Sequence, residues 1–200
     1  MSKNDNVSAR AEILAAVKKN KPEFAPLPSI PEFPGNSDGM LETFKEALKK
    51  VGGEAIVVPP DFDINHELKL MYEGKTVICS NLPFINIATI TATSIDTARG
   101  LEKIDLAILK GEFAVAENAA IWVPGSTLPH YAIPFITQHL VIIVNKNEMV
   151  SNMHQAYKKL TLETPGYGVF ISGPSKTADI EQSLVIGAHG ARSLRVFLME

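Results

Sequence analysis

The chain has 200 residues, of which 46% are hydrophobic and 20% are charged, and its formal net charge is −3. This length and balance are typical of one globular α/β domain with a single core. The slight negative charge offers no basic face for nucleic acid, and no apolar run approaches the roughly 20 residues that span a bilayer. We therefore expect a cytoplasmic protein that binds no nucleic acid and has no membrane span.

Cys79 is the only cysteine in the sequence. A lone thiol excludes an internal disulfide, and it cannot supply the several thiolates that an iron–sulfur cluster takes. Because Cys79 ends the apolar run of residues 76–78, its position favours a small buried hydrophobe over a nucleophile. We expect no cofactor bound by this chain.

The first predicted element is a short helix over residues 8–19, where apolar residues recur at helical spacing. Residues 21–35 carry five prolines, which exclude a regular helix or a central strand. Four large apolar side chains stand among these prolines: Phe24, Leu27, Ile30 and Phe33. We expect residues 1–36 to form a helix and a proline-rich arm that lies along its own domain or along a neighbouring subunit. We expect residues 37–200 to form the α/β domain.

Helices and strands alternate through the predicted domain. Helical spacing is found in residues 40–51, 65–72 and 149–160. Short apolar runs predict strands at residues 55–58, 76–79, 106–109, 119–123, 139–144, 168–172 and 194–199. The run at 139–144 is continuously apolar, which is typical of a strand covered on both faces. This pattern predicts a three-layer α/β domain with a mainly parallel sheet.

A polar segment separates the last two predicted strands. Gly173 and Pro174 stop the first of these strands, and Ser175, Lys176 and Thr177 then add donors and one positive charge. A sharp turn of this kind exposes successive backbone N–H groups, which suits a phosphate or a carboxylate. The glycine spacing of a nucleotide-binding fingerprint is absent, so spacing does not identify the anion. The alternative is a strand-to-helix turn with Thr177 as the helix N-cap.

Four ionisable residues follow in the same segment: Asp179, Glu181, His189 and Arg192. Residues two apart do not share a helical face, so Asp179 and Glu181 do not make a paired acid/base site. An imidazole at 189 and a guanidinium at 192 can lie beside the loop, where one shuttles a proton and the other holds a carboxylate. Alternatively, both only satisfy backbone groups at tight turns.

The run S-G-P-S-K-T-A-D-I-E at residues 172–181, followed by residues 184–187 and His189-Gly190, closely resembles the C-terminal signature of the LUD-domain family, which includes lactate utilization protein C. The resemblance continues back through residues 140–160 and 111–123. It implies the fold shared by sugar-phosphate isomerases and CoA transferases. It also implies ligand-binding roles for Gly173, Ser175, Lys176, Thr177, Asp179, His189, Arg192 and His139.

Glu117 is the candidate catalytic residue. CoA transferases use a glutamate nucleophile, and Glu117-Asn118 resembles the start of their motif; the alternative is a carboxylate that accepts a hydrogen bond from ligand or loop. In the family an acidic residue here is usually followed by Thr-Gly, whereas this chain has Asn118-Ala119. Glu117 with His130 and His139 also suggests a metal site, but neither histidine belongs to a close-spaced pair, so we expect no metal.

The resemblance implies a non-redox component of cytoplasmic L-lactate oxidation to pyruvate. Such a component works with separate iron–sulfur subunits and binds a small anionic ligand. Two alternatives stay open: a stand-alone enzyme acting on a phosphorylated or CoA-linked acid, and a ligand-binding regulatory domain without turnover. The proline-rich arm is expected to support assembly, either into a homo-oligomer or with the iron–sulfur subunits, because a semi-rigid segment docks at low ordering cost.

Overall fold

The structure is a computed structural model that describes residues 5–91, 98–160, 166–178 and 184–200. The chain divides into two compact units, Met1–Glu32 and Phe33–Glu200. The first unit contains helix α1 (Asp5–Lys19) and then residues without regular secondary structure, as the prolines predict. Within this unit Phe24 is 92% and Leu27 94% exposed.

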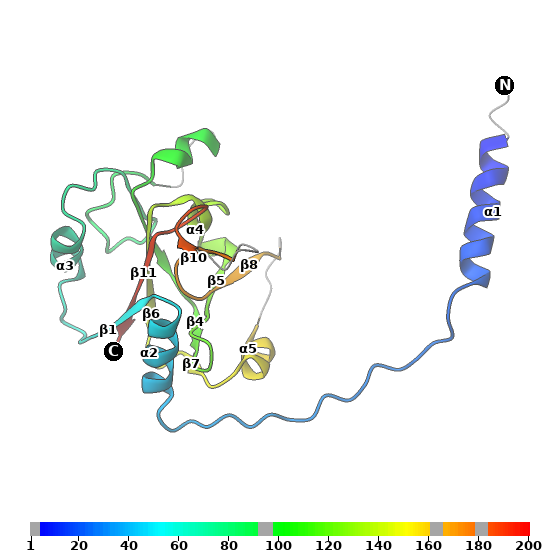
Figure 1. The fold of residues 1–200 in the computed structure, drawn as a ribbon, viewed down its shortest axis with the longest axis horizontal. Helices are drawn as coiled ribbons and strands as arrows, with labels where there is room; N and C mark the ends of the chain where they lie inside the picture. The colour runs from blue at the N-terminus through cyan, green and yellow to red at the C-terminus, as the bar shows by residue number, and fades with distance from the viewer. Residues whose placement is uncertain (1–4, 92–97, 161–165, 179–183) are drawn as a thin grey trace. The chain divides into compact units, whose positions relative to one another are not determined.

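A five-stranded parallel sheet forms the centre of the second unit (Figure 1). In spatial order its strands are β1 (Glu54–Val58), β11 (Ser193–Met199), β6 (His139–Asn145), β3 (Leu106–Lys110) and β2 (Ile78–Cys79). The register places His139 beside Ser193 on one side and Leu106 on the other. The amino-terminal ends of the three central strands therefore lie side by side at the same end of the sheet.

A second sheet, which the sequence did not predict as a separate layer, contains four strands. They are β7 (Met149–Val150), β4 (Phe113–Val115), β5 (Ile121–Pro124) and β8 (Gly168–Ile171). Residues 111–118, which lie between two predicted strands, contain β4, whose three residues are buried. Residues 149–160, expected to be one helix, instead start with the two-residue strand β7. Helix α5 (Met153–Lys159) follows this strand.

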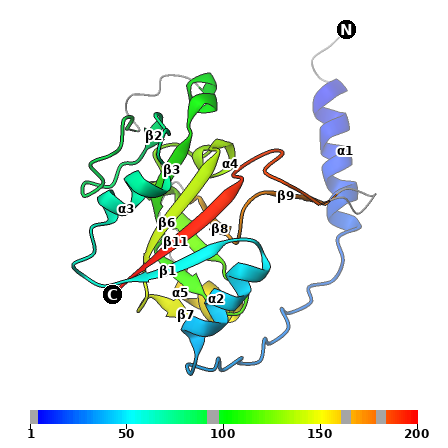
Figure 2. The same cartoon turned by 60° about the vertical axis from the view of Figure 1, so that its left-hand side comes forward.

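The parallel sheet is covered on both faces, as predicted for residues 139–144. Helix α3 (Ile64–Met71) packs on one face, where Val141 and Ile143 of β6 contribute to the core. Helix α2 (Met40–Lys50) and the second sheet cover the other face, toward which Leu140 and Ile142 point. Figure 2 shows β3, β6, β11 and β1 side by side, with α3 and α2 at their flanks. The domain is a three-layer α/β fold with a mainly parallel central sheet.

Side-chain caps start two of the short helices. The carboxylate of Asp63 accepts from the backbone N–H of His66 at 3.0 Å before α3, and the amide oxygen of Asn152 accepts from Gln155 at 3.0 Å before α5. Each cap is worth about 1 kcal/mol, which matters for a helix of only two turns. Within the described ranges, every helix is too short or too polar to cross a bilayer.

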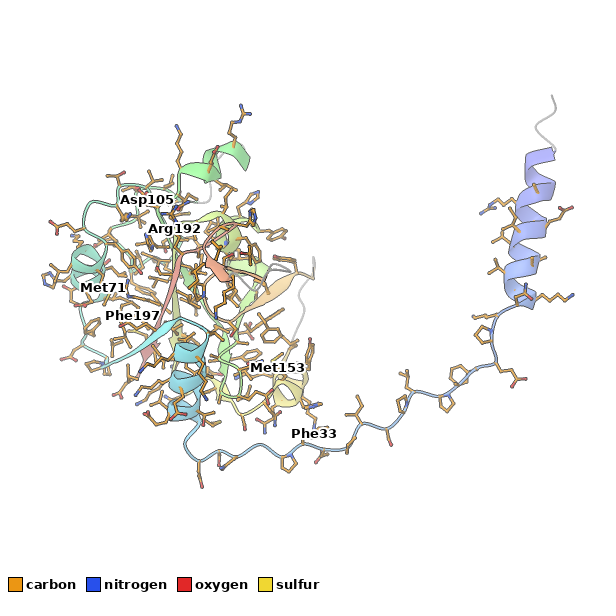
Figure 3. The ribbon with its side chains drawn as sticks, in the orientation of Figure 1. Phe33, Met71, Asp105, Met153, Arg192 and Phe197 are labelled. Atoms are coloured by element: carbon orange, nitrogen blue, oxygen red, sulfur yellow. The ribbon has the colours of Figure 1, made fainter. Side chains whose placement is uncertain are left out.

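The beginning of the second unit is anchored on α5. The Phe33 ring stacks on the His154 ring with centroids 4.0 Å apart, and the Asn152 side-chain amide donates to the Phe33 carbonyl at 3.4 Å. Figure 3 shows Phe33 close to Met153, the first residue of α5. The last part of the proline-rich segment therefore lies along its own domain.

Candidate functional site

The chain reverses direction at Gly173, directly after β8. The φ angle of Gly173 is +81°, and a methyl group built on its Cα would lie 2.9 Å from the carbonyl oxygen of Val51. Both facts exclude a side chain at this position. The turn at the end of α2 thus packs directly against the turn that opens the polar segment, and Pro174 is buried there.

The polar segment is a two-stranded hairpin of β9 (Lys176–Ala178) and β10 (Leu184–Ile186). Thr177 pairs with Val185, and its hydroxyl donates to the Val185 carbonyl at 3.3 Å. Thr177 is therefore a strand residue, and the alternative in which it caps a helix is wrong. Asp179 lies outside the described residues.

The backbone of Ser175 holds the base of this hairpin. Its N–H donates to the Ala191 carbonyl at 2.8 Å, and its carbonyl accepts from the Gly187 N–H at 2.9 Å. The Ser175 N–H is consequently occupied, so an anion here would be bound chiefly by side chains. The expected row of free backbone donors is interrupted at this residue.

A pocket of about 300 Å³, the first pocket, opens between the hairpin base and the short helix α4 (Ile133–Ile136). Its apolar lining residues are Pro134, Phe135, Leu140, Phe170, Ile171, Pro174 and Ala191. Its polar side chains are Ser172, Ser175, Lys176 and His189. One cation and two hydroxyl groups therefore stand at the rim of a mainly apolar cavity.

A second pocket of about 310 Å³ shares Phe135, His189 and Gly190 with the first. Its further polar side chains are Glu102, Gln138 and Arg192. A methyl group on Gly190 would lie 3.0 Å from the Phe135 carbonyl oxygen, so this glycine allows α4 to approach the segment before β11. Both pockets adjoin the amino-terminal ends of β6 and β11.

The fold thus brings together Gly173, Ser175, Lys176 and His189 in the first pocket, and His189 and Arg192 in the second. The side chains of Lys176, His189 and Arg192 are all exposed. The Lys176 ammonium and the Arg192 guanidinium, with the His189 imidazole between them, give the paired pockets donors suited to an anion, whereas the Glu102 carboxylate is the acceptor in the second pocket.

His139 points to the opposite face of the parallel sheet. Its ring centroid lies 5.6 Å from that of Tyr72, the residue that directly follows α3. Its Nδ1 lies 2.8 Å from the Ser193 hydroxyl. Neighbouring Leu140 lines the first pocket, and successive strand residues point to opposite faces. Among the residues that the structure describes, His139 lines neither pocket.

Burial lowers the pKa of His139 below its usual 6.5, and the positive charges of Lys75, Arg192 and Arg195 lower it further. The carboxylate of Asp105 opposes this effect. Two backbone N–H groups, those of Val77 and Thr76, donate to that carboxylate at 3.0 Å and hold the pKa of Asp105 below its usual value. Figure 3 shows Asp105 and Arg192 at the same end of the sheet.

Glu117 lies near the start of α5. Its Oε1 accepts from the backbone N–H of Met153 at 2.7 Å, and its own N–H donates to the Ser151 carbonyl at 3.1 Å. The described lining of the two pockets does not include it. The loop that carries Glu117 still reaches the first pocket, because the Ser172 hydroxyl donates to the Asn118 carbonyl at 2.6 Å.

Several pocket residues were not singled out from the sequence, above all Phe135, Glu102 and Gln138. Only Phe135 could have been suspected from the sequence, because it is a large apolar residue in a Pro-containing segment that is too short for a core helix. Among the described residues, no group of three or more His, Cys, Asp or Glu side chains is placed to hold a metal ion.

The family model of the LUD domain matches residues 85–199 of this chain, which include both sheets' central strands and the hairpin. The chain belongs to the LUD domain family. Two relatives, both called lactate utilization protein C, come from Oceanobacillus iheyensis and an Exiguobacterium strain. The first is 30% identical over 44% of this chain and 41% of its own length. The second is 26% identical over 78% of this chain and 75% of its own length.

A solved structure has the same fold as this LUD domain. It is the crystal structure of a DUF162 family protein from Deinococcus radiodurans, which superposes with a TM-score of 0.63. The superposition covers 84% of this chain and the whole of that chain, at 13% sequence identity. The likeness supports the three-layer α/β architecture.

Proposed function

We propose that this LUD-domain chain is a non-redox component of cytoplasmic L-lactate oxidation to pyruvate. It binds a small anionic ligand at the hairpin base and works with separate iron–sulfur subunits. The observation that carries the proposal is membership of the LUD domain family, together with two relatives of this chain that are named for lactate utilization.

The pockets supply a second line of support. Lys176 and Arg192 stand at the two adjoining pockets, with His189 lining both. A charge-assisted hydrogen bond from such a cation to a carboxylate is worth about 1.5–3 kcal/mol. Ligands of lactate metabolism, which are carboxylates, fit this chemistry.

The thiol content of the chain supports the part of the proposal that concerns separate iron–sulfur subunits. The sequence contains a single cysteine, Cys79, which is fully buried, and burial raises its pKa to about 11. An iron–sulfur cluster takes several thiolates, which a single cysteine does not supply, and this fits a component that works beside separate iron–sulfur subunits.

A complementation experiment tests the function. Deleting the gene should abolish growth on L-lactate, and the wild-type gene should restore it. Lys176→Gln should restore growth poorly, whereas Lys69→Gln, an exposed lysine on α3, should restore it fully. Normal growth on L-lactate after deletion, with no paralogue present, would refute the proposal.

The alternative of a stand-alone enzyme acting on a CoA-linked or phosphorylated acid gains no support from Glu117. Its carboxylate is engaged with the backbone of α5, as described above. Assays of the purified chain alone with CoA esters and sugar phosphates check this alternative directly.

A further inference from the structure

The size of the site is the first clue to its ligand. The first and second pockets measure about 300 and 310 Å³. Cavities of roughly 300 Å³ and more enclose ligands well above the size of a three-carbon acid. L-lactate, whose apolar part is one methyl group, would leave most of this space to water.

The two pockets also differ in chemistry. The first is walled mainly by apolar side chains, including Phe170 and Leu140, and its polar groups, Lys176 and two serine hydroxyls, stand at the rim. The second presents Arg192, Glu102 and Gln138, so it combines a cation, an anion and an amide. A ligand that fills both must have an apolar end and a polar end that carries more than one kind of polar group.

Phe135 connects the two compartments. It lines both pockets, and 48% of its surface is exposed although it is a large aromatic residue. The backbone of Phe135 packs closely against Gly190, since a methyl group on Gly190 would lie 3.0 Å from the Phe135 carbonyl oxygen. An exposed ring at the junction of two cavities offers a flat surface against which a planar apolar group can stack.

We infer that the two pockets form one elongated site for a 2-hydroxy carboxylic acid with a flat apolar body. The body lies in the first pocket against Phe135. The carboxylate lies in the second pocket at Arg192, and the 2-hydroxyl donates to Glu102. This inference rests on the proposed function, because it identifies the class of the anion that the site binds.

Three commercially available acids test the ring and the hydroxyl group of the inferred ligand separately. 3-Phenyllactate has the complete head and body, L-lactate lacks the ring, and 3-phenylpropionate lacks the hydroxyl. Isothermal titration of the full chain measures the affinity for each. We expect 3-phenyllactate to bind about tenfold more tightly than L-lactate, the scale for burying one aromatic ring, and several-fold more tightly than 3-phenylpropionate.

Variants assign these differences to residues. Phe135→Ala should remove most of the preference for 3-phenyllactate over L-lactate. Arg192→Gln should lower the affinity for both hydroxy acids by about tenfold or more, because it removes a charged hydrogen bond. Glu102→Gln should reduce the preference for 3-phenyllactate over 3-phenylpropionate. Lys69→Gln, on the opposite side of the sheet, should leave all three affinities unchanged, and thermal melts confirm that each variant is folded.

Equal affinity for 3-phenyllactate and L-lactate in the wild type would overturn the inference. So would an unchanged preference in Phe135→Ala, or no binding of any of the three acids at millimolar concentration. Failure of the inference and failure of the proposed function are distinguishable. Growth on L-lactate that depends on the gene and on Lys176, without a ring preference, keeps the function and overturns the inference.

Discussion

The Nδ1 atom of His139 lies 2.8 Å from the Ser193 hydroxyl, across the parallel strands β6 and β11. Each residue is the first of its strand, so this contact links the amino-terminal ends of β6 and β11. The Tyr72 ring packs beside it. The neighbouring polar group is the Arg195 guanidinium, which donates to the Tyr72 hydroxyl at 3.1 Å and to Glu54 at 2.8 Å. A proton added to His139 must therefore enter a partly buried site with a cation nearby.

This geometry predicts a dependence of stability on pH. Because the pKa of His139 is lowered below 6.5 in the folded chain, the unfolded state binds more protons between the two pKa values. The free energy of unfolding should rise with pH through this window and fall as the pH drops below 6.5. In His139→Asn, which keeps a polar atom near the position of Nδ1, thermal melts should show a weaker pH dependence in this range.

His66 is exposed, and His66→Asn serves as the control for loss of an imidazole away from this site. The lowered pKa of Asp105 places its own effect below pH 3.8, outside this window. Identical profiles for His139→Asn and the wild type would contradict the prediction.

Gly173→Ala should destabilise the domain more than Gly74→Ala. Both glycines have positive φ, +81° and +79°, which costs an alanine about 1–2 kcal/mol. Only at Gly173 would the new methyl group also lie 2.9 Å from a carbonyl oxygen, whereas the space around Gly74 is open. Chemical denaturation should show an additional loss of about 1 kcal/mol or more for Gly173→Ala. Equal losses would mean that the α2 turn simply moves aside.

Ala119 has φ of +56° although it is not glycine. Ala119→Gly removes a fully buried methyl group, worth about 0.8 kcal/mol, and adds backbone freedom to the unfolded chain, worth about 0.5–1 kcal/mol, but it also relieves about 1–2 kcal/mol of backbone strain. The net change in unfolding free energy should be close to zero. The matched variant Ala114→Gly, equally buried but in strand β4, should cost about 1–2 kcal/mol. Similar costs at both positions would show that Ala119 is not strained.

Cys79 should be protected from thiol reagents in the folded chain. It is fully buried, and burial raises its pKa to about 11, so little thiolate forms at neutral pH. Ellman's reagent should react slowly in native buffer and stoichiometrically in concentrated guanidinium chloride. Rapid reaction in native buffer would place the thiol at the surface.

Truncation of the arm should be tolerated up to Phe33. Residues 33–200 form a compact unit with its own core, so removal of residues 1–32 should leave the melting temperature of that unit nearly unchanged. Removal of residues 1–36 also deletes the ring that stacks on His154, and should cost about 0.5–1.5 kcal/mol more. Phe33→Ala in the full chain should reproduce that difference. Equal melting temperatures for the two truncations would show that the stack does not stabilise the domain.

The sequence by itself determined the order of the main helices and strands, the double burial of β6 and the LUD-domain resemblance. These properties are local or periodic: continuous apolarity in residues 139–144 indicates burial on both faces wherever the strand lies. The hairpin base was also foreseeable in part, because Gly173 and Pro174 must end a strand.

Only the tertiary structure decided how distant segments meet. Strand β4 is three residues long, too short for a periodic signal, and exists because β5 and β7 pair with it. His139 and Leu140 are adjacent in sequence but point to opposite faces, so only the sheet shows which of them reaches the pocket. Phe135 becomes a pocket wall because Gly190, far along the chain, lets α4 approach the hairpin base. Such contacts depend on three-dimensional proximity, which local sequence patterns do not encode.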